Sequence, residues 1–161
     1  MIDTLLISEI FLSKQGEGRF AGKKAIFVRF FGCNLRCIWC DTKYAVTYED
    51  ALKIQKIPYR IDVNGLERLI TETLSFYEKH VVFTGGEPLL QKGIIQLMKS
   101  LVKKGYIVEV ETNGTVLPEE HIPEVYYNVS VKLENSGNSR IKRIVAEAID
   151  YFARNPRAIF K

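Results

Sequence analysis

Residues 25–40 read Ala-Ile-Phe-Val-Arg-Phe-Phe-Gly-Cys33-Asn-Leu-Arg-Cys37-Ile-Trp-Cys40, an apolar run followed by a glycine and three closely spaced cysteines. These are the only cysteines in the 161-residue sequence. The C-x3-C-x2-C spacing presents three thiolates to one inorganic centre and supplies no fourth. A [4Fe-4S] cluster usually takes four cysteine ligands, one for each iron. The spacing therefore indicates an incompletely ligated cluster, with one iron open to bind another group.

Disulfides, zinc or simple burial account for the three cysteines less well. A disulfide framework is disfavoured because the count is odd, the cysteines are crowded, and no export signal precedes them. A structural zinc site normally needs four nitrogen or sulfur ligands, and His80 and His121 lie far away without ligand-like spacing. Zinc nevertheless stays open as an alternative. Buried structural thiols fit poorly with the polar neighbours Asn34, Arg36 and Asp41.

Composition predicts a single domain over residues 1–161, with a hydrophobic content of 47% and a charged content of 26%. No apolar run approaches the roughly 20 residues that cross a bilayer, and the N-terminus lacks the basic region of a signal peptide. The net charge of +4 is scattered. We therefore expect no membrane and no nucleic-acid partner. Free cysteines without an export signal favour the cytoplasm.

Apolar runs and helical patterns alternate along the chain. We expect the first helix over residues 64–74, capped by Asn64, and a second helix opened by Pro88 and ended by Gly105. Alternation of strands and helices predicts a parallel sheet, whose ligands gather at the carboxyl ends of the strands. The expected strands are residues 5–12, 25–31, 80–84, 106–110, 126–131 and 158–161, with a last helix over 141–152.

Four loops follow these strands and are expected to meet at that edge. They are the cysteine loop, the Gly85-Gly86 pair, the Thr-Asn-Gly turn at residues 112–114, and the Ser-Val-Lys segment at residues 130–132. This convergence makes a functional site at the edge more plausible than any single motif does.

Several motifs carry a resemblance to a known family. The cysteine spacing with Trp39 before the last cysteine, and the Thr-Gly-Gly-Glu-Pro segment at residues 84–88, resemble radical S-adenosylmethionine (SAM) enzymes. Within that superfamily the sequence resembles the 7-carboxy-7-deazaguanine synthase family, from Ser8 to about Lys161. The segments that carry this narrower match are residues 11–18, 27–37, 39–45, 111–114 and 130–137.

The resemblance implies a fold and a reaction. The fold would be α/β, an open, incomplete (β/α)6-type radical SAM barrel with an N-terminal β extension. The reaction converts 6-carboxytetrahydropterin into 7-carboxy-7-deazaguanine with loss of ammonia, a carbon–nitrogen lyase step toward queuosine or archaeosine. A homodimer and an electron donor such as flavodoxin are implied as well. The chain departs from the family pattern in two respects. It has valine at position 131, where the family commonly has proline. Family members extend beyond position 161, so C-terminal family elements are expected to be lacking.

The resemblance also assigns the cofactor residues. Cys33, Cys37 and Cys40 would bind three irons, and the fourth iron would chelate SAM, whose reductive cleavage gives a 5′-deoxyadenosyl radical. The residues assigned to SAM are Trp39, Gly86, Ser130 and Lys132. Each of these also has an alternative: a core aromatic for the tryptophan, an ordinary turn for the glycine, and strand solvation for the serine and lysine.

Arg29 stands inside an apolar run and needs a partner, because an unpaired buried charge is costly. A carboxylate of the pterin would suit its planar, bidentate guanidinium. The alternative is an internal ion pair with Glu17 or Asp41.

The remaining assignments concern the pterin and magnesium. Gln15, Gly16 and Glu17 offer groups that match the donor–acceptor edge of a pterin, and Thr84 adds a hydroxyl. The glycine-rich segment is equally consistent with a hairpin turn. Thr42 is the magnesium ligand by resemblance, and magnesium prefers oxygen ligands together with several waters. A capping threonine is the alternative.

Two further functions stay open. A radical SAM activase that abstracts hydrogen from a glycine of a partner protein shares the cysteine spacing, but residues 15–18 and 40–45 argue against it. A metal-binding module without catalysis is the non-enzymatic alternative.

Overall fold

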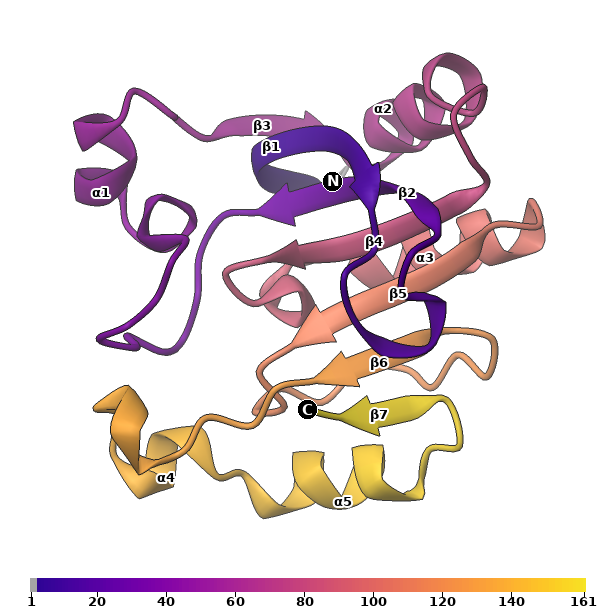
Figure 1. The fold of residues 1–161 in the computed structure, drawn as a ribbon. Helices are drawn as coiled ribbons and strands as arrows, with labels where there is room; N and C mark the ends of the chain where they lie inside the picture. Colours follow the sequence, from indigo (N-terminus) through magenta and orange to yellow (C-terminus); the bar gives the residue numbers. More distant parts are fainter. Residues whose placement is uncertain (1–2) are drawn as a thin grey trace.

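The computed structural model describes residues 3–161 of the chain. Seven strands within these residues form one sheet in the order β3-β1-β2-β4-β5-β6-β7 (Figure 1). The strands are β1 Thr4–Lys14, β2 Lys24–Phe30, β3 Tyr59–Asp62, β4 His80–Gly85, β5 Ile107–Thr112, β6 Tyr126–Val129 and β7 Ala158–Phe160.

The sheet has an antiparallel part and a parallel part. Strand β1 pairs antiparallel with β2 and with β3, whereas β2, β4, β5, β6 and β7 run parallel to one another. Because β3 and β7 are separate edges within the described residues, the sheet does not close. The expectation of an open α/β barrel with an N-terminal β extension is confirmed. Strand β3 was not expected, since its four residues are too short to show a pattern.

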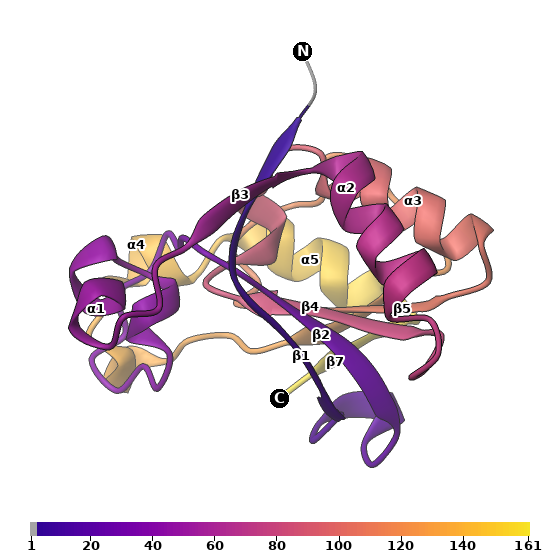
Figure 2. The same cartoon turned by 90° about the horizontal axis from the view of Figure 1, so that it is seen from above.

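Helices α2, α3 and α5 cover one face of the sheet, and the β1–β2 hairpin loop projects from the other (Figure 2). The helices are α1 Tyr48–Lys53, α2 Val63–Arg68, α3 Ile94–Lys103, α4 Arg140–Arg143 and α5 Ala146–Arg154. Shorter turns occupy Gly18–Phe20, Lys43–Ala45, Pro88–Leu90 and Glu134–Ser136, and a π-helical turn spans Leu69–Thr73. No helix in residues 3–161 combines the length and the apolar character that a bilayer crossing requires.

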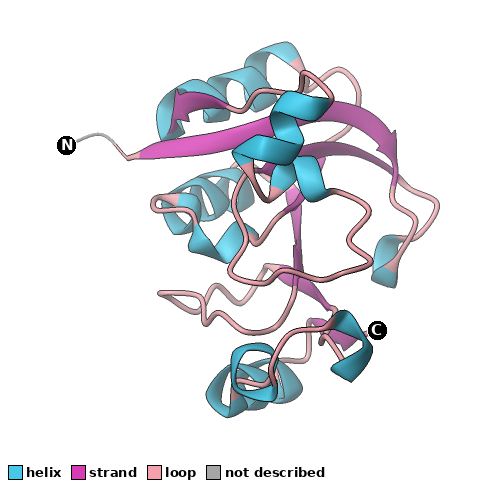
Figure 3. Cartoon of the chain, turned by 90° about the vertical axis from the view of Figure 1, so that its left-hand side faces the viewer, coloured by secondary structure: helices cyan, strands magenta, loops and turns pink. Residues whose placement is uncertain are grey.

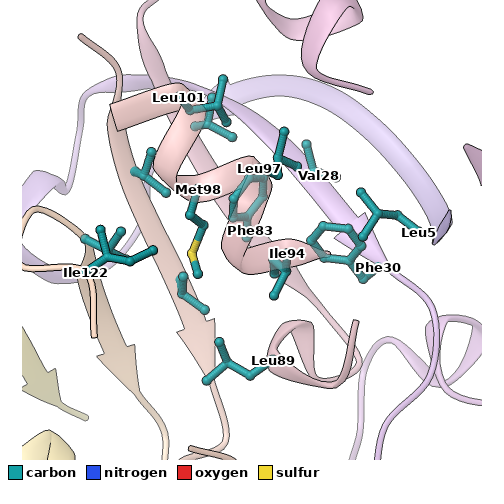
Figure 4. Packing of buried hydrophobic residues seen from close by; sticks show 14 of the residues in the cluster. Leu5, Val28, Phe30, Phe83, Leu89, Ile94, Leu97, Met98, Leu101 and Ile122 are labelled. Carbon is teal, nitrogen blue, oxygen red and sulfur yellow. The ribbon is translucent and has the colours of Figure 1, made fainter. Parts of the chain in front are cut away.

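Strand alternation gives the two faces different chemistry. In β4, Val81 and Phe83 pack into the main core beneath the helices, where Leu97 and Met98 of α3 lie (Figure 4). The intervening Val82 joins a small cluster on the opposite face. Successive side chains of a strand point to opposite sides, so every second residue is left for the face without helices.

The helix expected over residues 64–74 corresponds to α2 and the π-helical turn after it, and its start differs from the prediction. Asn64 is not its cap. Asp62, the last residue of β3, accepts a hydrogen bond from Gly65 N at 2.8 Å and caps α2. An aspartate placed one residue before the first helical turn satisfies a free N–H in that turn, which Asn64 inside the turn does not do.

The other two expected helices are each divided. Pro88 opens only a 3₁₀ turn, and α3 begins after Gly93, whose φ is +85°. Gly105 (φ +82°) follows the end of α3 as expected. The segment over 141–152 separates into α4 and α5, with extended backbone at Val145 between them.

We expect Leu97→Ala to lower the free energy of unfolding by about 2–5 kcal/mol, because the buried side chain leaves a cavity between α3 and the sheet. The measurement is denaturant unfolding followed by circular dichroism. Leu52→Ala on the exposed face of α1 is the matched control, expected to change stability by less than about 0.5 kcal/mol. Equal effects of the two changes would contradict this account of the core.

Candidate active site at the carboxyl edge of the sheet

A cavity of about 640 Å³ opens where the parallel strands end. Figure 3 faces this edge, where loops connect the strands to the helices. The volume lies within the roughly 300–1,000 Å³ typical of small-molecule sites. All of the residues that the sequence assigns to the cluster, SAM, magnesium and the pterin line this cavity. The expected convergence of the four loops is therefore found, while the individual roles stay predictions.

The three cysteines are partly exposed and lie on one wall of the cavity. Backbone and side-chain donors face two of the sulfurs: Leu35 N lies 3.4 Å from Cys33 Sγ, and Asn138 Nδ2 lies 3.3 Å from Cys37 Sγ. Burial raises the pKa of the Cys33 thiol. Donors directed at sulfur suit a thiolate, the form in which cysteine binds metals.

The cysteine arrangement fits a cluster better than a single ion. Among residues 3–161, no three or more His, Cys, Asp or Glu side chains are grouped closely enough to hold one metal ion. A structural zinc requires four ligands converging on one point, whereas each cysteine of a cubane binds a different iron. The three thiols on this wall suit the corners of a [4Fe-4S] cluster, whereas a structural zinc would need a fourth ligand beside them.

The glycine pair at the end of β4 is required by backbone packing. Gly85 has a φ of +122°, and a Cβ on Gly86 would overlap the carbonyl oxygen of Gly32. Gly86 N donates to Phe30 O at 3.1 Å, and Glu87 N donates to Gly32 O at 2.8 Å. The pair thus fixes the start of the cysteine loop against β4, which is more than an ordinary strand-to-helix turn does.

Trp39 is not a core aromatic, because 51% of it is exposed at the rim of the cavity. Its Nε1 donates to Asn135 O at 2.9 Å, and Lys132 Nζ lies 5.5 Å from its ring centroid. Lys132 Nζ also donates to Ser130 Oγ at 2.7 Å. Tryptophan, lysine and serine therefore form one continuous wall, so bulk solvation alone does not describe Ser130 and Lys132.

Arg29 has a partner that the sequence did not suggest. The alternative of an ion pair with Glu17 or Asp41 is wrong: Arg29 Nε donates to Glu9 Oε1 at 2.8 Å across the β1–β2 register. Glu9 also accepts from Tyr44 OH. Within the described residues, no acceptor is hydrogen-bonded to the terminal nitrogens of Arg29. The flat end of the guanidinium thus remains available at the cavity wall.

Glu9 holds its charge because of these donors. Burial raises the pKa of Glu9, but hydrogen bonds from Lys56, Tyr44 and Arg29 outweigh burial and lower the pKa below its ordinary value. The Lys56 Nζ–Glu9 Oε2 distance is 2.7 Å. An ionised Glu9 keeps Arg29 in place without covering the bidentate edge of the guanidinium.

Gln15 and its neighbours form a hairpin loop. A hairpin turn was the alternative given for this glycine-rich segment in the sequence. Gln15 N donates to Lys23 O at 2.8 Å, and the Gln15 side chain is turned inward. Its Nε2 donates to Glu109, and its Oε1 accepts from Glu17 N. Gln15 thus lines the cavity with its amide engaged in these two bonds, beside exposed Gly16 and the Glu17 carboxylate, which is paired with Lys161.

The two threonines differ in their engagement. Thr84 Oγ1 donates to Glu111 Oε2 at 2.7 Å, and Glu111 also lines the cavity, although the sequence alone suggested no role for it. Thr42 does not cap the turn that follows it. Its hydroxyl instead lies 3.7 Å from Cys40 Sγ. The capping alternative is thus wrong for Thr42, and a magnesium ligand there stays a prediction.

Comparison with known proteins assigns the family. The family model described as "Radical SAM superfamily" matches residues 27–129, which is more than half of the chain. The chain belongs to the radical SAM superfamily. Membership implies a [4Fe-4S] cluster and SAM as cofactors, and the three thiols beside the glycine corner are the groups that suit them.

The relatives of this radical SAM chain share one name. It is 44% identical over 115 residues to the 7-carboxy-7-deazaguanine synthase of Rhodopirellula baltica, covering 71% of this chain and 41% of that protein. The protein of that name from Pyrobaculum aerophilum is 37% identical over 160 residues, 96% of this chain and 64% of its own length. The crystal structure of QueE from Escherichia coli superposes with a TM-score of 0.74 at 29% identity, covering 91% of this chain and 67% of that one. The matched part of the chain therefore spans about two fifths to two thirds of the length of these proteins.

A buried carboxylate within the Thr-Gly-Gly-Glu-Pro segment, to which the sequence assigned no role, ties the site together. Glu87, fully buried beside the glycine pair, accepts from Thr112 Oγ1 at 2.9 Å and from Asn113 N at 2.8 Å. It therefore joins the end of β4 to the loop after β5. Burial raises the pKa of Glu87 to about 7, although these hydrogen bonds and nearby Lys132 act to lower it. A charged residue between a glycine pair and a proline was the available sequence signal.

A second cluster of buried polar side chains supports the hairpin loop between β1 and β2. Glu109 is fully buried and accepts from His80 Nε2 at 2.6 Å and from Asn128 Nδ2 at 3.0 Å, besides Gln15. His80 Nδ1 lies 3.1 Å from Lys24 O. Both ring nitrogens thus face oxygens, so the His80 side chain, through Glu109 and Lys24 O, joins the sheet to the hairpin loop. The sequence shows the histidine but not its partner.

Stability should depend on the protonation of Glu87. The folded pKa of about 7 exceeds the ordinary 4.5, so the stabilising contribution is fully present below pH 4.5 and is lost as pH rises through 7. We expect the unfolding free energy of the wild type, relative to Glu87→Gln, to fall by roughly 3 kcal/mol between about pH 4.5 and pH 8. Urea unfolding at several pH values measures this. Glu124→Gln, at an exposed site, is the control. Parallel curves for wild type and Glu87→Gln would disprove the shift.

Proposed function

We propose that this chain is the core of a 7-carboxy-7-deazaguanine synthase. The reaction is the radical ring contraction of 6-carboxytetrahydropterin to 7-carboxy-7-deazaguanine with loss of ammonia, on a route to queuosine or archaeosine. The observation that carries the proposal is the single cavity lined by the cysteine loop, the glycine corner and the Arg29 side chain together. The shared name of relatives 37–44% identical to the chain supports it.

The cofactor side of the cavity would be built on the cysteine loop. When bound, the cluster supplies the electron that cleaves SAM. Gly86 holds the loop against β4 by backbone contact, and the loop presents its three thiols to the cavity. Trp39, Ser130 and Lys132 close the adjacent wall, where an adenosine ring and the hydroxyls of a ribose would find an aromatic face and polar partners.

The substrate side would be built on β2, β4 and the hairpin loop. Arg29 offers its two terminal nitrogens to the pterin carboxylate as a bidentate pair. Thr84 and Glu111 place a hydroxyl and a carboxylate where the donor-rich edge of a pterin needs acceptors. Gly16 and Glu17 face the same space from the hairpin loop.

Other parts of the proposal rest on the family resemblance. Thr42, whose hydroxyl does not bond the backbone turn, would provide one oxygen ligand to magnesium, and the substrate carboxylate another. A one-electron donor such as flavodoxin, a homodimer and a cytoplasmic setting complete the proposal. The ordinary charge balance and the free cysteines are compatible with that setting.

The deciding experiment is anaerobic reconstitution with iron and sulfide, followed by incubation with 6-carboxytetrahydropterin, SAM, magnesium and a strong reductant. We expect 7-carboxy-7-deazaguanine by mass spectrometry, and no product from Cys37→Ala. SAM cleavage without this product, with labelling of a glycine in a partner protein, would favour the activase. One bound zinc and no cluster would favour a metal-binding module.

Arg29→Ala should weaken pterin binding by more than tenfold while SAM cleavage persists, because removal of a desolvated charged partner costs roughly 2–5 kcal/mol. Equilibrium binding of the pterin and 5′-deoxyadenosine formation are measured on the same preparation. Arg60→Ala, on the exposed edge strand β3, is the control and should leave both unchanged. An unaltered pterin affinity in Arg29→Ala would remove this residue from the substrate site.

A further inference from the structure

Residues 136–138 hold the cysteine loop on both sides of Cys37. Ile38 N donates to Ser136 O at 3.0 Å, and Arg36 N donates to Asn138 Oδ1 at 2.8 Å. The segment lies so close that a Cβ at Gly137 would meet Ile38 Cγ2 at 2.8 Å. We call residues 136–138 the strap. The two N–H groups that flank Cys37 are both bound by the strap, so the position of this cysteine depends on it.

The orientation of the Asn138 amide follows from its partners. Arg36 N is a backbone donor and can pair only with the oxygen of the amide. The amide nitrogen must then face the other way, where Cys37 Sγ lies at 3.3 Å. Exchanging the two ends of the amide would set a donor against a donor and an oxygen against a thiolate.

Both ends of the Asn138 side-chain amide are engaged. Its two amide hydrogens serve Cys37 Sγ and Ser136 Oγ, the latter at 3.2 Å, and its oxygen serves Arg36 N. Ser136 is completely buried, which anchors this end of the strap. A side chain with three satisfied partners has little rotational freedom, so the N–H remains directed at the sulfur.

The other two sulfurs receive weaker side-chain contacts. Asn113 Nδ2 is 3.8 Å from Cys33 Sγ and is also bonded to Asn34 Oδ1 at 3.0 Å. Cys40 Sγ has the Thr42 hydroxyl at 3.7 Å. Cys37 thus has the shortest side-chain N–H contact of the three cysteines. Hydrogen bonds to the sulfurs are one of the factors that set the reduction potential of an iron–sulfur cluster.

We propose that Asn138 raises the reduction potential of the cluster bound at Cys33, Cys37 and Cys40, by donating a hydrogen bond to Cys37 Sγ. Reduction adds negative charge that spreads onto the ligand sulfurs, and an N–H donor stabilises the more negative state. Asn138 is thus a positioning residue that favours electron uptake. This inference rests on the cluster of the proposed function and is independent of the pterin reaction.

Two variants separate tuning of the cluster from support of the loop. Asn138→Asp keeps an oxygen for Arg36 N but replaces the N–H at Cys37 by a second oxygen, whereas Asn138→Ala removes both contacts. The readout is the midpoint potential of the reconstituted cluster without SAM, from a redox titration followed by electron paramagnetic resonance, together with iron per chain. We expect more negative potentials in both variants. For Asn138→Ala, the equilibrium constant of reduction should fall about tenfold, or about 59 mV for one electron, and Asn138→Asp should shift further.

Asn135→Ala is the matched control, because Asn135 lies in the same segment, is exposed, and contacts Trp39 through its backbone oxygen alone. Its potential should equal that of the wild type. A wild-type potential in Asn138→Asp would overturn the proposal, even if Asn138→Ala shifts, because Asn138 would then serve only Arg36 N. Should Asn138→Asp fold but take up no iron, the potential of Asn138→Ala decides.

Failure of this proposal and failure of the proposed function are distinguishable. A wild-type protein that binds four irons, shows the Asn138 shift and yields no deazaguanine retains this inference and loses the function. A protein that makes the product with unshifted variants keeps the function and loses this inference. A wild-type protein without any cluster overturns both.

Discussion

The site depends on the contact between two backbones, where the end of β4 meets the start of the cysteine loop. Gly86 N bonds to Phe30 O, Glu87 N bonds to Gly32 O, and no side chain fits between them. This contact sets the distance between the cysteine loop and the parallel sheet, and therefore where three thiols stand relative to the cavity. Buried Glu87 extends the same constraint to the loop after β5. A local requirement for glycine thus controls the geometry of a site assembled from three separate loops.

The second constraint is the two-residue period of the strands. It directs Val28, Phe83 and Val110 into the core beneath the helices, and it leaves Arg29 and Thr84 on the face without helices. A polar group on that face is tolerated because it is paired or reaches the cavity. The hairpin loop covers the rest of this face through the buried Glu109 cluster. The same alternation therefore creates both the stability of the sheet and the polar lining of the cavity.

The sequence predicted those features that depend on local chemistry or on strand direction. The cysteine spacing, the glycine pair and the βα alternation placed the candidate site at the edge where the cavity lies, because carboxyl ends of parallel strands meet there whatever the side chains are. Pairings that depend on register were beyond reach: Glu9 meets Arg29 only because β1 and β2 pair in one particular alignment. Asn138 was missed for a related reason, since the strap reaches Cys37 from a distant part of the chain. The Asn64 cap failed because a better cap, Asp62, stands two residues earlier.

Buried polar groups in this chain differ in how much of their bonding capacity is already used. Glu109 accepts from three side chains and both ends of the Asn138 amide are engaged, so both residues act on the structure around them. Arg29 is the contrasting case, because Glu9 takes its Nε while its terminal nitrogens face the cavity. Binding a ligand there requires no protein bond to be broken, which keeps the cost of recognition low. Residual bonding capacity therefore separates the two residues: Arg29 keeps donors free at the cavity, as the proposed binding of a carboxylate requires, whereas Asn138 is engaged in holding the cysteine loop.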